Sequence, residues 1–166
     1  MNKKESIILA LLLGLILILG VAAAIVAAGR QPQVIINEFV PPAFDQAAII
    51  GQPPELPANL GYGILAMQED ASVGLCRNVM VTDGNAMLYL TAPGTNRCWV
   101  RVLIYAEDGT LLGESGLLRP GEYITSVALC TTPKTGSLVS VRIQLYEPDT
   151  YLSLGSANAQ VYIMGS

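Results

Sequence analysis

Apolar and polar side chains alternate along several short segments in the C-terminal two thirds of the chain. Val139, Val141 and Ile143 alternate with Ser140 and Arg142, and residues 100–104 and 159–163 repeat the pattern. Successive side chains of a β-strand point to opposite faces, so this period of two predicts half-buried strands. The expected strands are residues 63–68, 75–82, 86–92, 98–106, 110–117, 122–130, 138–146 and 157–164.

Four dipeptides with turn chemistry separate these expected strands. Asp83-Gly84 and Asp108-Gly109 favour tight hairpins, because glycine adopts positive φ at little cost. Pro93-Gly94 and Pro120-Gly121 indicate further turns. Seven or eight short strands in about 100 residues predict an all-β fold, specifically an antiparallel immunoglobulin-like β-sandwich over residues 61–166.

The N-terminal segment has a different pattern. Ile7 to Ala28 is an uninterrupted run of 22 Ile, Leu, Val, Ala and Gly residues. The hydrocarbon core of a bilayer needs about 20 apolar residues in a helix, so residues 7–29 are expected to form one transmembrane helix. Lys3 and Lys4 in the tip, residues 1–6, favour a cytoplasmic N-terminus and an extracellular C-terminal domain on the cell membrane. The alternative is a cleaved signal peptide with an apolar core at residues 7–20 and a small-residue cleavage site at 22–24.

Six of the ten prolines lie between these two parts, in residues 30–60. Each proline lacks a backbone donor and favours extended geometry in the residue before it, so this segment is expected to be an extracytoplasmic spacer. It also contains apolar residues. Part of it is therefore expected either to dock on the domain or to form an edge strand, with Val34 to Ile36 as the best candidate.

Composition argues against catalysis and nucleic-acid binding. The chain contains no histidine, which removes the most common general base and metal ligand. The net charge is −4, and a mildly acidic domain is poorly suited to nucleic acid. No catalytic, cofactor-binding or metal-binding residue is expected. The acidic pairs Glu69-Asp70 and Glu107-Asp108, the segment Asp83-Gly84-Asn85 and the lone domain lysine, Lys134, all lie at expected turns or loops.

Three further motifs carry a resemblance. They are Asn96-Arg97-Cys98-Trp99, the segment 108–112 and the segment 115–124, in which Gly116-Leu117 precedes Pro120-Gly121. Over residues 73–164 the chain resembles small single-pass surface proteins of Gram-positive bacteria, which carry an N-terminal anchor, a linker and one β-sandwich domain. Gly136-Ser137-Leu138 departs from the Gly-Thr-Tyr-like start of the next strand in that family. The resemblance implies a location and a fold, and it supplies no catalytic residue.

The three cysteines, Cys76, Cys98 and Cys130, suggest one candidate disulfide. If strands 75–82 and 98–106 both run in the same direction, Cys76 and Cys98 begin them at the same end, and a disulfide is allowed outside the membrane. The alternative is that all three are small buried apolar residues.

The expected function is a membrane-tethered cell-surface interaction or structural module without catalytic activity, because an anchor and a spacer precede a domain that lacks catalytic groups. The expected partners are the membrane itself, through one integral span, and an envelope protein or a surface glycan. The alternatives are an assembly or chaperone subunit of an envelope secretion or transfer system, which would use an exposed strand edge, and an extracytoplasmic carboxylate-based hydrolase. Aromatic residues such as Trp99 and Tyr105 are expected to pack in the core or on a sheet, since aromatics are enriched in strands.

Overall fold

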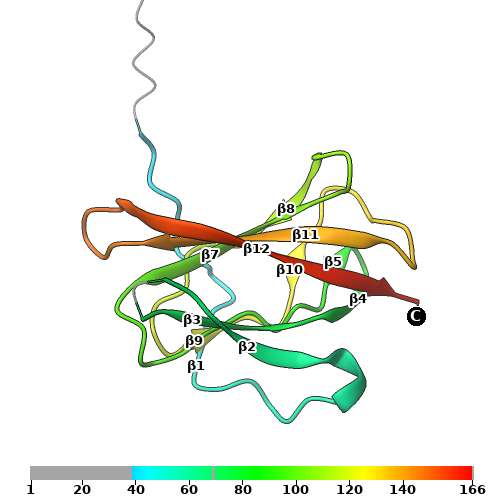
Figure 1. Cartoon of the computed structure of the whole chain (residues 1–166), viewed down its shortest axis with the longest axis horizontal. Coiled ribbons are helices and arrows are strands. Elements are labelled where there is room, and N and C mark those ends of the chain that lie inside the picture. Colours follow the sequence, from blue (N-terminus) through cyan, green and yellow to red (C-terminus); the bar gives the residue numbers. More distant parts are fainter. Residues whose placement is uncertain (1–38, 69, 166) are drawn as a thin grey trace, which may run out of the picture. The chain divides into compact units, whose positions relative to one another are not determined.

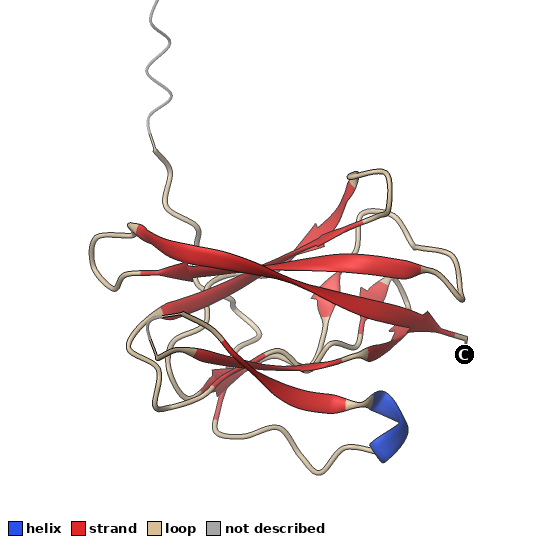
Figure 2. Ribbon diagram, in the orientation of Figure 1, coloured by secondary structure: helices blue, strands red, loops and turns tan. Residues whose placement is uncertain are grey.

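The computed structural model describes residues 39–68 and 70–165. The chain divides into two compact units, residues 1–39 and 40–166, and all the secondary structure that is described lies in the second. This unit is all-β apart from one short 3-10 helix, and its strands form two sheets that lie one above the other (Figure 1, Figure 2). The all-β, two-sheet prediction is therefore confirmed.

The first sheet has five short strands in the order β1-β9-β6-β3-β2. Its strands are β1 (Ile49–Ile50), β2 (Tyr62–Ala66), β3 (Ser72–Cys76), β6 (Thr91–Ala92) and β9 (Glu122–Tyr123), and the 3-10 helix η1 (Ala58–Leu60) precedes β2. All neighbouring strands in this sheet are antiparallel. The strands β1 and β2 form its two edges.

The second sheet has seven strands in the order β10-β5-β4-β12-β11-β7-β8. Its strands are β4 (Asn78–Thr82), β5 (Asn85–Ala86), β7 (Trp99–Tyr105), β8 (Leu111–Glu114), β10 (Val127–Ala128), β11 (Leu138–Tyr146) and β12 (Ser153–Met164). Its two edges approach each other, since Gly113 of β8 forms a bridge with Leu129, directly after β10. The sheet is therefore nearly closed. One pair, β12 with β4, is parallel, in contrast to the purely antiparallel prediction.

A single apolar core fills the space between the two sheets. The inward residues of β7 and β11 alternate with half-buried or exposed ones, as in Val100, Val102 and Ile104 or Val141 and Ile143. They pack against residues of the five-stranded sheet such as Val73 and Leu75 in one continuous cluster. Burying apolar surface contributes roughly 25 cal/mol per Å², so this alternation is the main source of the fold's stability.

The structure confirms several expected strands and corrects others. The strand predicted at 138–146 has the same bounds in the structure, and β7 lies within the predicted 98–106. The predicted strand 75–82 is instead two strands, since β3 ends at Cys76 in one sheet and β4 begins at Asn78 in the other. The chain therefore changes sheets at Arg77. The predicted hairpin at Asp83-Gly84 is confirmed, with positive φ at both residues, 51° and 74°.

Part of the expected spacer belongs to the folded unit. The strand β1 pairs with β9, and residues 40–60 belong to the same compact unit as the two sheets. The edge strand in this segment is Ile49–Ile50, whereas Val34 to Ile36 lie outside the described residues. Within residues 39–68 and 70–165, no helix is long and apolar enough to cross a bilayer. The predicted span at residues 7–29 lies outside these ranges.

Candidate binding groove

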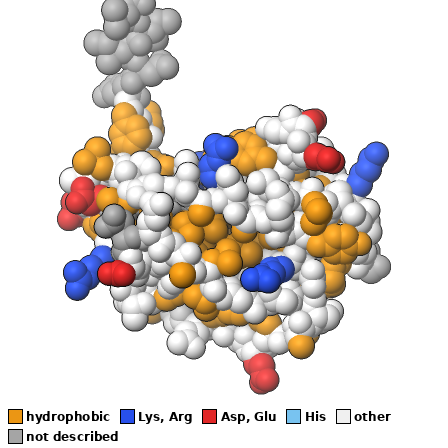
Figure 3. Space-filling view, viewed as in Figure 1, with side chains coloured by type: hydrophobic (Ala, Val, Ile, Leu, Met, Phe, Trp, Pro, Cys, Tyr) orange, Lys and Arg blue, Asp and Glu red, His pale blue; other side chains and the backbone are white. Residues whose placement is uncertain are grey.

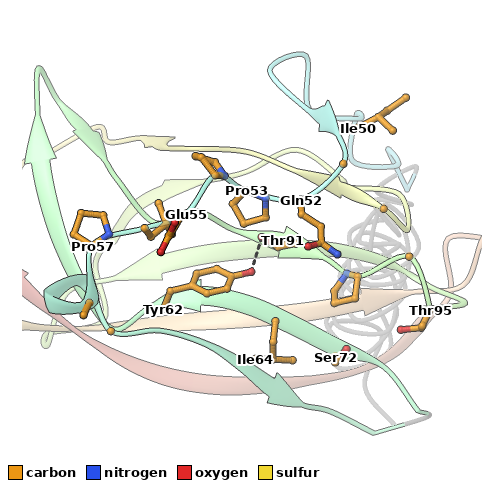
Figure 4. Close-up of a pocket in the computed structure, with 18 residues that line it drawn as sticks. Ile50, Gln52, Pro53, Glu55, Pro57, Tyr62, Ile64, Ser72, Thr91 and Thr95 are labelled. Atoms are coloured by element: carbon orange, nitrogen blue, oxygen red, sulfur yellow. Dashed lines mark hydrogen bonds between the residues drawn. The ribbon is translucent and has the colours of Figure 1, made fainter.

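A groove of about 1070 Å³ lies on the outer face of the five-stranded sheet. Its roof is a proline-rich segment, residues 51–57, which connects edge strand β1 to η1 and which we call the strap (Figure 4). The floor consists of outward-facing residues of β2, β3 and β6, and the loop after β6 closes one end. Most of the lining is apolar, and it includes Pro53, Pro54, Leu56, Pro57, Tyr62, Ile64 and Pro93.

The floor of the groove depends on one glycine. The Tyr62 hydroxyl donates a 3.0 Å hydrogen bond to Thr91 Oγ1, across the intervening strand β3. Gly74 is the β3 residue beneath the ring, and a Cβ atom at this position would overlap the Tyr62 hydroxyl. Thr91 is buried and its hydroxyl donates to the Tyr89 carbonyl at 3.2 Å. A tyrosine, a glycine and a threonine on three neighbouring strands therefore shape the floor.

The strap is fixed at both ends. At its start, the Gly51 N–H donates to the Gly121 carbonyl at 2.8 Å. Beyond its end, Leu60 of η1 is buried in the core, and the Asn78 side-chain amide donates to the Asn59 carbonyl at 2.7 Å. Leu56 adds a partly buried contact with the core. These contacts at the two ends of the strap therefore hold the groove open.

The lining of the groove is poor in charged side chains. Glu55 is the one charged residue in its lining, and it is exposed. Between Gln52 and Leu56, no main-chain hydrogen bond joins the strap to another described residue. Carbonyl groups along the strap are thus free to accept hydrogen bonds, and the prolines at 53 and 54 contribute only acceptors.

Three of the aromatic residues form a second, structural cluster. The Trp99 ring makes edge contacts with Phe44 at 4.8 Å and with Tyr151 at 5.0 Å, and the Arg119 guanidinium lies 3.6 Å from the centre of the Phe44 ring. Asp45 adds main-chain and side-chain hydrogen bonds to residues 116 and 117. This cluster pins residues 40–48 to the domain, which agrees with the packing role expected for Trp99.

The cysteines lie differently from the arrangement that favoured their pairing. Cys76 ends β3 instead of beginning a strand, and Cys98 precedes β7 in the other sheet. The Asn96 side chain, two residues before Cys98, forms hydrogen bonds with the main-chain N–H and C=O groups of Ser72. Ser72 begins β3 and Cys76 ends it, so these two residues lie about 13 Å apart at the spacing of a strand. All three cysteines are free thiols in the structure, so the candidate Cys76–Cys98 disulfide is not formed there. Cys76 and Cys98 are buried, as the alternative expected, whereas Cys130 is exposed.

Burial changes the acidity of the two inner thiols. It raises the pKa of Cys76 to about 11. It also raises the pKa of Cys98, against a smaller lowering effect from a backbone hydrogen bond. Since the thiolate is the reactive form of cysteine, neither residue is suited to be a nucleophile.

The remaining candidate groups do not form a site together. Asp70, Glu107 and Asp108 lie at exposed turns, and Lys134 lies in an exposed loop. A hydrogen bond from the Thr110 main chain lowers the pKa of Asp108, as is common for an acid in a turn. Glu69 lies outside the described residues. Across the described chain, no three His, Cys, Asp or Glu residues gather as metal ligands would.

Sequence reasoning did not find the groove. It identified the prolines of the strap but interpreted them as a spacer, and it gave Gly74 no role. A glycine between two apolar residues of a strand, Val73 and Leu75, is the signal that could have indicated a close approach at this point. No protein-family model, curated protein or solved structure matches the chain, so the resemblance to Gram-positive surface proteins stays a prediction.

Proposed function

We propose that the protein is a membrane-tethered cell-surface module that binds an extended segment of another envelope protein in the groove beneath the strap. In this proposal residues 7–29 form the anchor, and the domain is an immunoglobulin-like sandwich outside the cell. The observation that carries the proposal is a preformed, mostly apolar groove of about 1070 Å³ with one charged residue in its lining.

The lining favours a polypeptide over a glycan. Glycan sites use aromatic faces and many polar side chains, whereas this groove has one aromatic ring, and its hydroxyl is already bonded to Thr91. Free carbonyls along the strap suit the N–H groups of an extended main chain, and the proline rings and Ile64 suit apolar side chains. Because Glu55 is the one charged group in the lining, the segment is expected to be neutral or basic.

A random dodecapeptide library displayed on phage tests the binding step against the full chain in detergent micelles. We expect enrichment of neutral or basic peptides rich in apolar residues. Ile64→Glu should abolish their binding, whereas Leu138→Glu should leave it unchanged. The two residues are matched, since their side chains are 55% and 56% exposed and both lie in strands, but Leu138 is outside the groove.

Two results would contradict this step. One is the absence of any enriched peptide while purified cell-wall glycan binds, and the other is equal peptide binding by both variants. The location has its own test, because an impermeant protease added to intact cells should degrade the domain. Protection of residues 40–166 in intact cells would refute the surface location.

The alternative function, an assembly or chaperone subunit of an envelope system, is favoured by a separate observation, the open edge of β12. This strand has 12 residues, but β4 pairs with only the last three, Tyr162 to Met164.

A further inference from the structure

The open side of β12 has a defined register. On its other side β12 pairs with β11 from Ser153 to Tyr162. The Ile163 N–H donates to the Ser137 carbonyl on the β11 side, whereas the Tyr162 N–H donates to the Arg77 carbonyl on the β4 side. Since the direction of main-chain groups alternates along a strand, Ser156, Asn158 and Gln160 direct their N–H and C=O groups toward the open side.

These six main-chain groups have no hydrogen-bond partner among the described residues. The side chains of Ser156, Asn158 and Gln160 are exposed, while Ala157 and Ala159 point inward and are half-buried. Between residues 156 and 161 the edge carries no charge, no proline and no bulge. Charges, prolines and bulges are the features that usually protect an edge strand from pairing with another chain.

The open edge is bounded at both ends. At one end the chain enters β4, next to Tyr162. At the other end Gln68, just after β2, lies against Gly155. A Cβ atom added to Gly155 would lie 3.4 Å from Gln68 Oε1. A small pocket of about 200 Å³ lies there, lined by Ala66, Met67, Gln68, Leu145, Ser156 and Ala157. Figure 3 shows apolar side chains gathered in the middle of the face on which β12 and β2 run.

We propose that this edge, residues 155–161, binds a single extended strand of another polypeptide, which adds to the seven-stranded sheet beside β12. Main-chain groups of the added strand pair with those of residues 156, 158 and 160. Its inward side chains are apolar, and one fills the small pocket, since a cavity of about 150 Å³ already holds a benzene-sized group. Its outward side chains are polar, like the side chains of Ser156, Asn158 and Gln160 beside them.

The bounded edge suits a lone strand better than a second copy of the domain. Antiparallel pairing of two β12 strands about Asn158 would set Leu154 of one copy opposite Tyr162 of the other. The β4 strand already occupies that side of Tyr162, so it would overlap with the neighbouring copy. A strand of about seven residues avoids this overlap.

Hydrogen exchange of the full chain in detergent micelles tests the proposal. The probe is a capped heptapeptide of alternating threonine and valine. In the free protein, we expect the amides of Ala157 and Ala159 to be protected and those of Ser156, Asn158 and Gln160 to exchange fast. Added peptide should slow exchange of these three amides by roughly tenfold or more.

Two N-methylated forms of the same peptide provide a control that leaves the protein unchanged. Methyl groups on the amides that face β12 should abolish the protection, and methyl groups on the alternate amides should preserve it. Ile64→Glu in the groove should have no effect on the three amides, so this proposal and the groove proposal fail separately.

Three results would overturn the inference. The first is that no peptide protects residues 156, 158 and 160. The second is that protection rises with protein concentration without peptide, which would indicate a second copy. The third is that protection develops at an edge of the five-stranded sheet, β1 or β2, instead.

Discussion

Gly74→Ala tests whether this glycine allows the Tyr62 ring to lie across β3. The added Cβ atom would overlap the Tyr62 hydroxyl and would lie 2.8 Å from its Cζ atom and 3.0 Å from Ile64 Cδ1. The Ile64 side chain is exposed and can move. The Tyr62 ring cannot stay in place, so it must leave the floor of the groove.

The energetic cost of this change follows from the interactions that the Tyr62 ring makes in the groove. The hydrogen bond from Tyr62 to Thr91 contributes about 1 kcal/mol. Exposure of part of the ring costs about 1–2 kcal/mol. Alanine in place of glycine within a strand returns about 0.5–1 kcal/mol. Thr91 still donates to the Tyr89 carbonyl, so no buried hydroxyl loses all its partners. The free energy of unfolding should therefore fall by about 1–2.5 kcal/mol.

The decisive assay is a double-mutant cycle with Tyr62→Ala, measured by urea denaturation of the full chain. Trp99 is the one tryptophan of the sequence and lies outside the groove lining, so its fluorescence reports global unfolding. Once the ring is gone, Gly74→Ala should cost nothing further and should add about 0.5 kcal/mol of stability. If the costs of the two single changes simply add in the double variant, Gly74 and Tyr62 do not interact in this way.

Three further predictions concern the seven-stranded sheet and the thiols. Gly113→Ala should lower the free energy of unfolding by about 2–4 kcal/mol, because its Cβ atom would overlap the Ala128 carbonyl where the two edges of the sheet meet. The control is Gly63→Ala, which has open space around it and should be neutral or slightly stabilising in the same urea assay; equal effects at both sites would contradict the close approach. In native protein at pH 8, Ellman's reagent should react rapidly with Cys130 alone, and Cys76 and Cys98 should react after unfolding. Because burial raises the pKa of Cys76 to about 11, its contribution to stability should be constant below about pH 8.5 and fall as pH rises toward 11; a flat stability profile over that range would refute this.

The parts of the fold that could be predicted from sequence are those where one face of a strand is buried. In β11, Val139 to Leu145 point inward at every second position, so the alternation alone gave both bounds. The break at Arg77 could not be found in this way. Apolar residues lie at odd positions on both sides of it, Val73 and Leu75 before and Val79 and Val81 after, so the period continues while the chain changes sheets.

Strand pairing also explains why both proposed binding surfaces were missed. The groove forms because the strap crosses the five-stranded sheet. The strand order of that sheet cannot be predicted from the local pattern of apolar and polar residues. The open edge of β12 exists because β4 pairs with only three of its residues, and this depends on pairing between segments about 80 residues apart. The local sequence did predict correctly that Glu107 and Asp108 lie at a turn, where both side chains are exposed to solvent.

The position of β12 also has a consequence for synthesis. It is the last of the described strands, yet in the order of the sheet it lies between β4 and β11. A chain that stops before residues 153–164 cannot join the two halves of that sheet, which leaves β4, β5 and β10 without the strand that links them to β11. Premature termination or C-terminal trimming near residue 160 should therefore prevent maturation of the whole domain instead of shortening it by one strand.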